Sequence, residues 1–178
     1  MNPFLIINAN YKTHTALYDI LVSHSQSVAK KARDIAEKHP ELHIDTQFVS
    51  EAAMLHDIGI FLTNAPEIAC HGENRYIEHG YLGADLLRKE GFPKHALVCE
   101  RHTGTGLSLD QIQQQNLPLP HRDMRPVSIE EQLICFADKF FSKTKLNQEI
   151  PIATIRQQLS KFGADSVAQF DSWSALFL

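Results

Sequence analysis

Apolar residues recur every three to four positions along much of this 178-residue chain, and this spacing limits its fold more than any other feature. Such a period places apolar side chains on one face of an α-helix. The clearest case runs from Leu17 to Ile35 and is followed by Pro40, which ends a helix. No segment shows the apolar–polar alternation of a half-buried strand. We therefore expect an all-α protein.

Capping signals place the other helices. Asp45 suits the N-cap of a helix that stops near Gly59, and Ser128 opens a capping-box pattern completed by Glu131. The same reasoning predicts further helices over 77–90, 93–102, 151–163 and 165–178. Residues 103–127 contain several prolines and are expected to form a long loop with room for one short helix. The length suits a single helical domain over residues 1–178.

Charge and cysteine content exclude several classes of protein. A net charge of -4 argues against a protein that coats anionic lipid, and it makes a nucleic-acid polymer an unfavoured partner. No apolar run approaches the roughly 20 residues that span a bilayer, and the apolar patch at 4–7 lacks the basic start of a signal peptide. The three cysteines are far apart and odd in number, as expected of reduced core thiols. We expect a cytoplasmic protein without a membrane anchor, and we leave its oligomeric state open.

Polar side chains that can bind metal occur at helix ends or on predicted inward faces. His24 lies on the apolar stripe of its helix, and Asp138 lies among apolar residues of the helix that begins after Ser128. The remaining members of the set end or begin helices: His56, Asp57, His79 and His102. Each has an ordinary interpretation, because a lone core histidine is usually just hydrogen-bonded. Several such groups in one small core are most easily tolerated if they share a cation.

The sequence from Ala52 to Gly59, AAMLHDIG, resembles the signature of the HD superfamily of metal-dependent phosphohydrolases in its HDIG form. In that family an upstream histidine, the His-Asp pair and a distant aspartate bind metal, and His24 and Asp138 match the outer positions. Two further histidines mark the branch with two metals, which His79-Gly80 and His102-Thr103 resemble. Bacterial HD-type dinucleoside tetraphosphate hydrolases and small uncharacterised HDIG proteins share this layout. The resemblance covers about residues 17–142, and the helical extension over about 143–178 resembles no known family.

The resemblance implies an HD-type helical bundle with two divalent or transition-metal ions. Six ligands would crowd a single ion, whereas two ions can share one carboxylate. We assign Asp57 to the shared position, with His24, His56 and Asp138 on one ion and His79 and His102 on the other. Imidazole and carboxylate ligands without thiolate favour iron first, with manganese or another transition metal as the alternative.

The expected reaction is hydrolysis of a phosphoester or phosphoanhydride bond by a metal-bound hydroxide. The expected substrate is a small phosphorylated molecule, and family habit points to a nucleotide. Asp57 and Lys139 are the expected catalytic residues, with Lys139 holding the anion. Other cationic side chains are candidate substrate contacts: Arg101, His71, Arg75, His121, Arg122 and Arg125. We also expect the 103–127 loop to border the substrate pocket.

Two other functions fit the same residues. HD-type di-iron proteins include oxygenases, so oxidation is an alternative to hydrolysis. A non-catalytic regulatory module stabilised by metal is the second alternative. No ligand of the two-metal pattern is missing and no sensor domain is attached, and both observations favour an enzyme.

Overall fold

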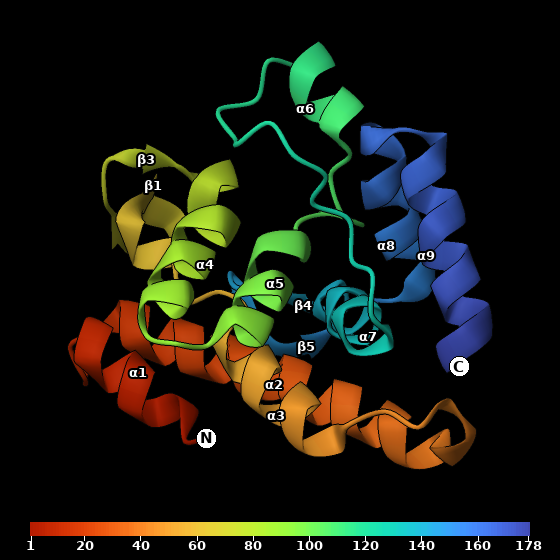
Figure 1. Cartoon of the computed structure of the whole chain (residues 1–178), viewed down its shortest axis with the longest axis horizontal. Coiled ribbons are helices and arrows are strands. Elements are labelled where there is room, and N and C mark those ends of the chain that lie inside the picture. Colours follow the sequence, from red (N-terminus) through yellow and green to blue (C-terminus); the bar gives the residue numbers. More distant parts are fainter.

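The computed structural model describes all residues from Met1 to Leu178 and contains nine α-helices with two small sheets (Figure 1). The prediction of a helical fold is confirmed. None of the helices combines the length and the apolar character needed to cross a membrane.

Two long helices form the base of the domain. Helix α2 (Ala16–Lys38) begins at Thr15, and α3 (Thr46–Leu55) begins at Asp45, whose side chain accepts the Phe48 N–H as predicted. The stripe of α2 is buried against α3 and contains His24. The pairing of these helices therefore carries a histidine into the core.

Helices α4 (His79–Lys89) and α5 (Pro93–Arg101) form an antiparallel pair that lies side by side in Figure 1. Gly91 connects them with a φ of +84°, a conformation that glycine adopts without strain. The N-terminus of α4 lies directly against the turn after α3. Neither Gly59 nor Gly83 has a side chain at this contact, so the two backbones meet closely.

Helix α7 (Ile129–Asp138) joins the C-terminal extension to the core. The Ser128 hydroxyl accepts the Glu131 N–H, but the Glu131 carboxylate turns to Val127 N–H and Arg101 instead of closing the capping box. Phe136 packs against Phe170 and Phe177 of α9 (Ala164–Phe177), which follows α8 (Ile152–Leu159) along the chain. One apolar core thus extends from the first helix to the last.

The 103–127 segment has its own small core. Helix α6 (Leu109–Gln114) supplies Ile112, which packs with Leu119 and Met124. Ile77, in the single turn before α4, and Tyr81 of α4 lie against these residues. The segment is therefore packed beside the helix end that carries His79, and its short helix agrees with the prediction.

The structure corrects the sequence analysis at both sheets and at the N-terminus. Strands that were not predicted are β1 (Thr63–Ala65), β2 (Cys70–His71), β3 (Asn74–Arg75), β4 (Phe141–Ser142) and β5 (Lys145–Glu149). Most are only two or three residues long, which is too short to show alternation. The first sheet has the order β2-β1-β3, and β4 pairs antiparallel with β5. Helix α1 (Pro3–Asn10) was also not predicted.

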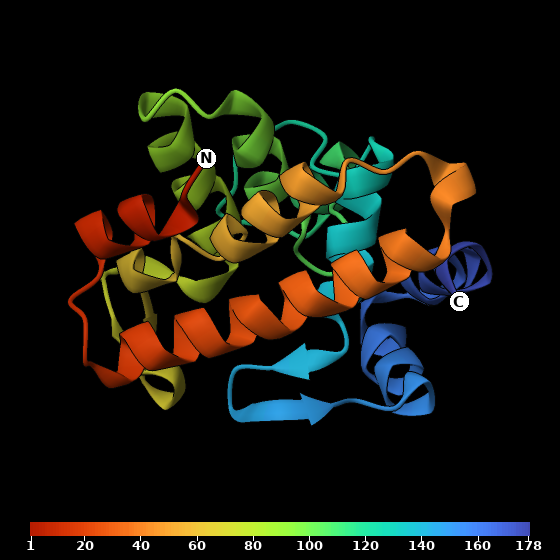
Figure 2. The ribbon, with the colours of Figure 1, turned by 90° about the horizontal axis from the view of Figure 1, so that it is seen from below.

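Short single-turn helices complete the chain. They are η1 (Pro40–Leu42), η2 (Ile60–Leu62), η3 (Pro66–Ile68), η4 (Tyr76–Glu78) and η5 (Ser160–Phe162). Figure 2 shows the β4–β5 hairpin running alongside α2, which it contacts. Cys70, Cys99 and Cys135 are free and buried, as predicted.

Gly59→Ala tests the close approach between the α3 turn and α4. An alanine Cβ would lie 2.5 Å from the Gly83 nitrogen and even nearer to the His79 carbonyl oxygen. Because both are backbone atoms of α4, we expect the substitution to lower the free energy of unfolding by about 3 kcal/mol. Gly91→Ala is the matched control, since it meets no atom within 4 Å and carries only the left-handed strain of about 1 kcal/mol. Equal losses in denaturant unfolding would contradict this account.

Candidate metal centre

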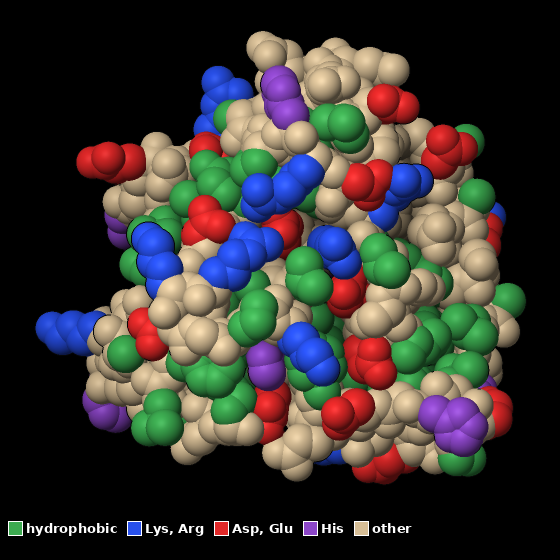
Figure 3. Space-filling view, in the orientation of Figure 1, with side chains coloured by type: hydrophobic (Ala, Val, Ile, Leu, Met, Phe, Trp, Pro, Cys, Tyr) green, Lys and Arg blue, Asp and Glu red, His purple; other side chains and the backbone are tan.

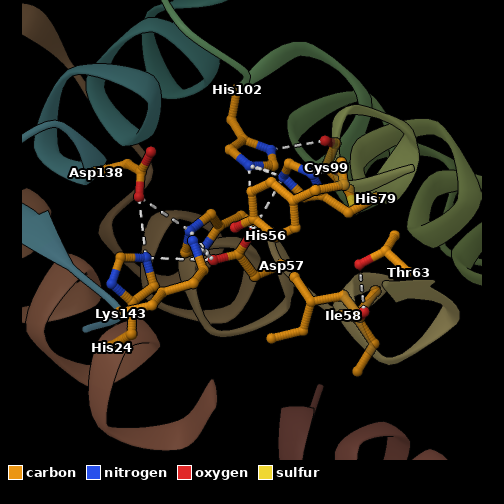
Figure 4. Close-up of polar contacts among 12 residues, drawn as sticks. His24, His56, Asp57, Ile58, Thr63, His79, Cys99, His102, Asp138 and Lys143 are labelled. Atoms are coloured by element: carbon orange, nitrogen blue, oxygen red, sulfur yellow. Dashed lines mark hydrogen bonds and ion pairs between the residues drawn. The ribbon is translucent and has the colours of Figure 1, made fainter. Parts of the chain in front are cut away.

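Five separate elements bring the six predicted polar residues together. His24 comes from the middle of α2, and His56 and Asp57 follow the last residue of α3. The other three lie at helix ends: His79 opens α4, His102 follows α5 and Asp138 ends α7. Figure 4 shows their side chains converging from these elements.

The first group surrounds one oxygen of each aspartate. His24 Nε2 lies 3.0 Å from Asp138 Oδ1 and 3.2 Å from Asp57 Oδ2. His56 Nε2 lies 3.1 Å from Asp57 Oδ2 and 3.4 Å from Asp138 Oδ1. Four donor atoms thus face a common point, and all lie within 4.8 Å of one another.

The second group surrounds the other oxygen of Asp57. The Nε2 atoms of His79 and His102 each lie 3.4 Å from Asp57 Oδ1 and 3.0 Å from each other. Asp57 therefore belongs to both groups, with one oxygen facing each. This is the arrangement expected of a carboxylate shared by two ions.

Hydrogen bonds to the backbone aim three of the four rings. Nδ1 of His56 lies 2.6 Å from the Ala53 carbonyl, and Nδ1 of His79 lies 2.6 Å from the Tyr76 carbonyl. His102 Nδ1 lies 2.7 Å from the Cys99 carbonyl. A carbonyl only accepts, so Nδ1 carries a proton in each ring, and the Nε2 lone pair of the neutral imidazole is the one that points to the centre.

A cation fits this donor set. The Nε2 lone pairs of His79 and His102 face each other, so neither ring has a proton for the other. His56 Nε2 and both oxygens of Asp57 are buried without a hydrogen-bond partner of acceptable geometry. Such groups are costly to bury unpaired. A positive ion in each group satisfies all of them at once.

The electrostatics follow from burial and charge. Burial acts to raise the pKa of Asp57, but Lys143 and the nearby imidazoles hold it well below its usual value. Burial acts to lower the pKa of His56, but Asp57 and Asp138 raise it to about 9. Burial and His102 lower the pKa of His79 to about 3, and burial lowers that of His102. The first group therefore attracts positive charge even before a metal binds.

Two lysines lie at the centre. Lys139 Nζ lies 2.8 Å from Asp138 Oδ2 and donates to the His102 carbonyl at 3.2 Å. Lys143 Nζ lies 2.6 Å from Asp57 Oδ2. The sequence analysis singled out Lys139 but missed Lys143, which enters from the connection of the unpredicted β4–β5 hairpin. Its only sequence signal was its position five residues after Asp138.

The other predicted substrate contacts lie in ion pairs or at the surface. Arg101 pairs with Glu131 at 2.8 Å, and Arg122 pairs with Glu100. Arg125 pairs with Asp123 at 2.6 Å, and it lines a groove with Arg101 and with Trp173 of α9. His71, Arg75 and His121 are exposed. On the face in Figure 3, basic and acidic side chains are interspersed. Contact of these residues with substrate stays a prediction.

Comparison with known proteins identifies the family. The HD domain family model matches residues 21–142. An uncharacterised protein of Methanocaldococcus jannaschii is 35% identical over 70% of this chain and 68% of its own length. Two tRNA (cytidine(56)-2'-O)-methyltransferases are also similar. The one from Picrophilus torridus is 30% identical over 81% of this chain, and the one from Thermoplasma volcanium is 32% identical over 71%. The chain matches only 36% and 33% of these two proteins.

A solved structure has the same fold. The HD domain of the L. monocytogenes phosphodiesterase PgpH aligns with a TM-score of 0.51 over 93% of this chain and 100% of that domain, at 17% identity. The family match includes all six polar residues, from His24 to Asp138. The chain therefore belongs to the HD domain family, the superfamily of metal-dependent phosphohydrolases that its motifs resemble.

Proposed function

We propose that this chain hydrolyses a phosphoester or phosphoanhydride bond of a small phosphorylated molecule, with a nucleotide as the first candidate. The observation that carries the proposal is the position of Asp57. One of its oxygens faces His24 and His56, and the other faces His79 and His102. A carboxylate placed in this way suits two cations held side by side.

The donor set also limits the identity of the cations. Imidazole nitrogens and carboxylate oxygens are present and thiolates are absent, which favours iron, manganese or a similar ion. When bound, two such ions supply an ionised water as nucleophile and neutralise charge that develops on the phosphoryl group. His24, His56 and Asp138 would hold one ion, His79 and His102 the other, and Asp57 both.

The exposure of the side chains around the centre indicates the side from which substrate would enter. Side-chain exposure is 5% or less for Asp57 and the four imidazoles, but 11% for Asp138 and 12% for Lys139. We infer that substrate reaches the centre from the side of Asp138, Lys139 and Lys143, whose side chains are 11%, 12% and 13% exposed. There the Lys139 ammonium supplies positive charge for an anion, and the buried imidazoles exclude bulk water from the far side.

Relatives support the substrate class only in general terms. The PgpH HD domain has been solved in complex with cyclic-di-AMP, which is a nucleotide. The methyltransferase name belongs to proteins of which this chain matches about a third. Their activity belongs to the whole proteins and is not assigned to this chain.

Metal analysis tests the shared role of Asp57. We expect two ions per chain in the wild type, about one in His79→Ala and none in Asp57→Ala, because only Asp57 serves both groups. Mass spectrometry of acid-digested protein gives the count, and circular dichroism verifies the fold of each variant. His95→Ala is the matched control, since His95 is a buried histidine of α5 that faces Glu51, away from the centre. Equal metal content in Asp57→Ala and the wild type would exclude the shared role.

A phosphate-release screen tests the reaction. We expect the metal-loaded protein to release phosphate or a nucleoside phosphate from at least one member of a panel of nucleotides, dinucleoside polyphosphates and cyclic dinucleotides. Chelation should abolish turnover, and added manganese or iron should restore it. The panel includes a tRNA transcript as a polymer, and oxygen uptake is followed in parallel with ferrous protein. Oxygen uptake with an organic substrate and no hydrolysis would favour the oxygenase alternative instead.

A further inference from the structure

Lys143 is a partly buried cation to which the proposed reaction assigns no role. It lies in the connection between β4 and β5, and 13% of its side chain is exposed. Its ammonium contacts Asp57 Oδ2, the same oxygen that faces His24 and His56 (Figure 4). Its position is therefore tied to the metal centre and not to the hairpin alone.

The hairpin is fixed where it presents this lysine. Ser142 pairs with Lys145 across the turn, and Phe141 pairs with Glu149. Glu149 in turn forms an ion pair with Lys31 of α2. The backbone at Lys143 is thereby held beside α2, while the four-carbon side chain retains its rotatable bonds.

Lys143 and a cation in the first group would need the same oxygen. Asp57 Oδ2 lies 3.2 Å from His24 Nε2 and 3.1 Å from His56 Nε2, so a cation bound between these nitrogens also takes Oδ2. An ammonium 2.6 Å from that oxygen would then lie beside a divalent charge. Repulsion between like charges at such distances is large in a buried site. A cation bound there would therefore weaken the contact between the Lys143 ammonium and Asp57 Oδ2 and favour its release.

The surroundings show where the ammonium can go. The Tyr76 ring is stacked on His79 with centroids 4.7 Å apart, and Lys143 Nζ lies 6.0 Å from the centre of the Tyr76 ring. Asp138 and Lys139, the other partly exposed groups of the centre, lie on the side where substrate enters. An ammonium that leaves Asp57 can therefore remain at the mouth of the centre, on the side of the Tyr76 ring.

We propose that Lys143 binds a phosphoryl oxygen of the substrate, and that its contact with Asp57 is made only while no cation is bound there. The inference rests on the proposed function, since it assumes a cation at the centre and a phosphoryl group above it. It makes metal and phosphate cooperative, because the metal frees the ammonium that phosphate uses. It also makes Lys143 and metal competitors.

Binding measurements on Lys143→Met test whether Lys143 competes with metal and binds phosphate. Titration calorimetry with Mn²⁺ alone should show tighter binding than in the wild type, because the competing charge is gone. Titration of the Mn²⁺-loaded protein with inorganic phosphate should show binding weaker by about tenfold or more, the usual worth of one charge-assisted hydrogen bond. If Lys143 only stabilised the fold, its replacement would not tighten Mn²⁺ binding and weaken phosphate binding at the same time.

Lys145→Met is the matched control, because it removes an exposed lysine from the same hairpin and should change neither affinity. Lys143→Gln replaces the methionine variant if that protein does not fold. Unchanged or weaker Mn²⁺ binding, or unchanged phosphate binding, overturns the role of Lys143. Neither titration requires turnover, so a failed substrate screen leaves this test intact. A wild type that binds no Mn²⁺ counts against the proposed function itself and removes the basis of the inference.

Discussion

A carboxylate with no exposed surface cannot be left alone in a protein core, and Asp57 is such a group. It is surrounded by imidazoles from α2, from the turn after α3, and from the ends of α4 and α5, together with an ammonium from the β4–β5 hairpin. Each of these elements must reach the middle of the domain for the charge to be compensated. The helices must therefore pack closely for the centre to form. Gly59 and Gly83 let α4 approach the α3 turn, so they contribute both to the packing and to the centre.

Local signals predicted the elements that carry this centre. The apolar stripe of α2 placed His24 inward, and the caps at Asp45 and Ser128 fixed the starts of α3 and α7. These signals suffice because a helix is defined by contacts a few residues apart. The convergence of six residues was predicted from motif order and family resemblance. Periodicity alone says that a side chain points inward, but not what it meets there.

The sequence did not predict which residues contact each other across the tertiary structure. Lys143 lies in a hairpin whose strands are too short to show alternation, so nothing marked it as buried. Arg101 and Arg122 were named as candidate substrate contacts, and the structure pairs each with a carboxylate from a distant position in the sequence. Glu131 satisfied the pattern of a capping box but contacts Arg101 and Val127 instead. In each case the deciding contact joins residues that are remote in the chain or depends on a competing donor.

The bonds from His56, His79 and His102 to carbonyls three residues earlier have a consequence for how such a centre tolerates change. Each ring takes its direction from its own turn of backbone, not from a neighbouring helix. A substitution elsewhere that shifts one helix against another would carry the ring along as a rigid piece, displaced but still aimed the same way. Such a shift would change the distances between the donor atoms of different helices but not the direction of each ring relative to its own turn. The direction of these donors is therefore set by the local backbone, whereas their spacing is set by the packing between helices.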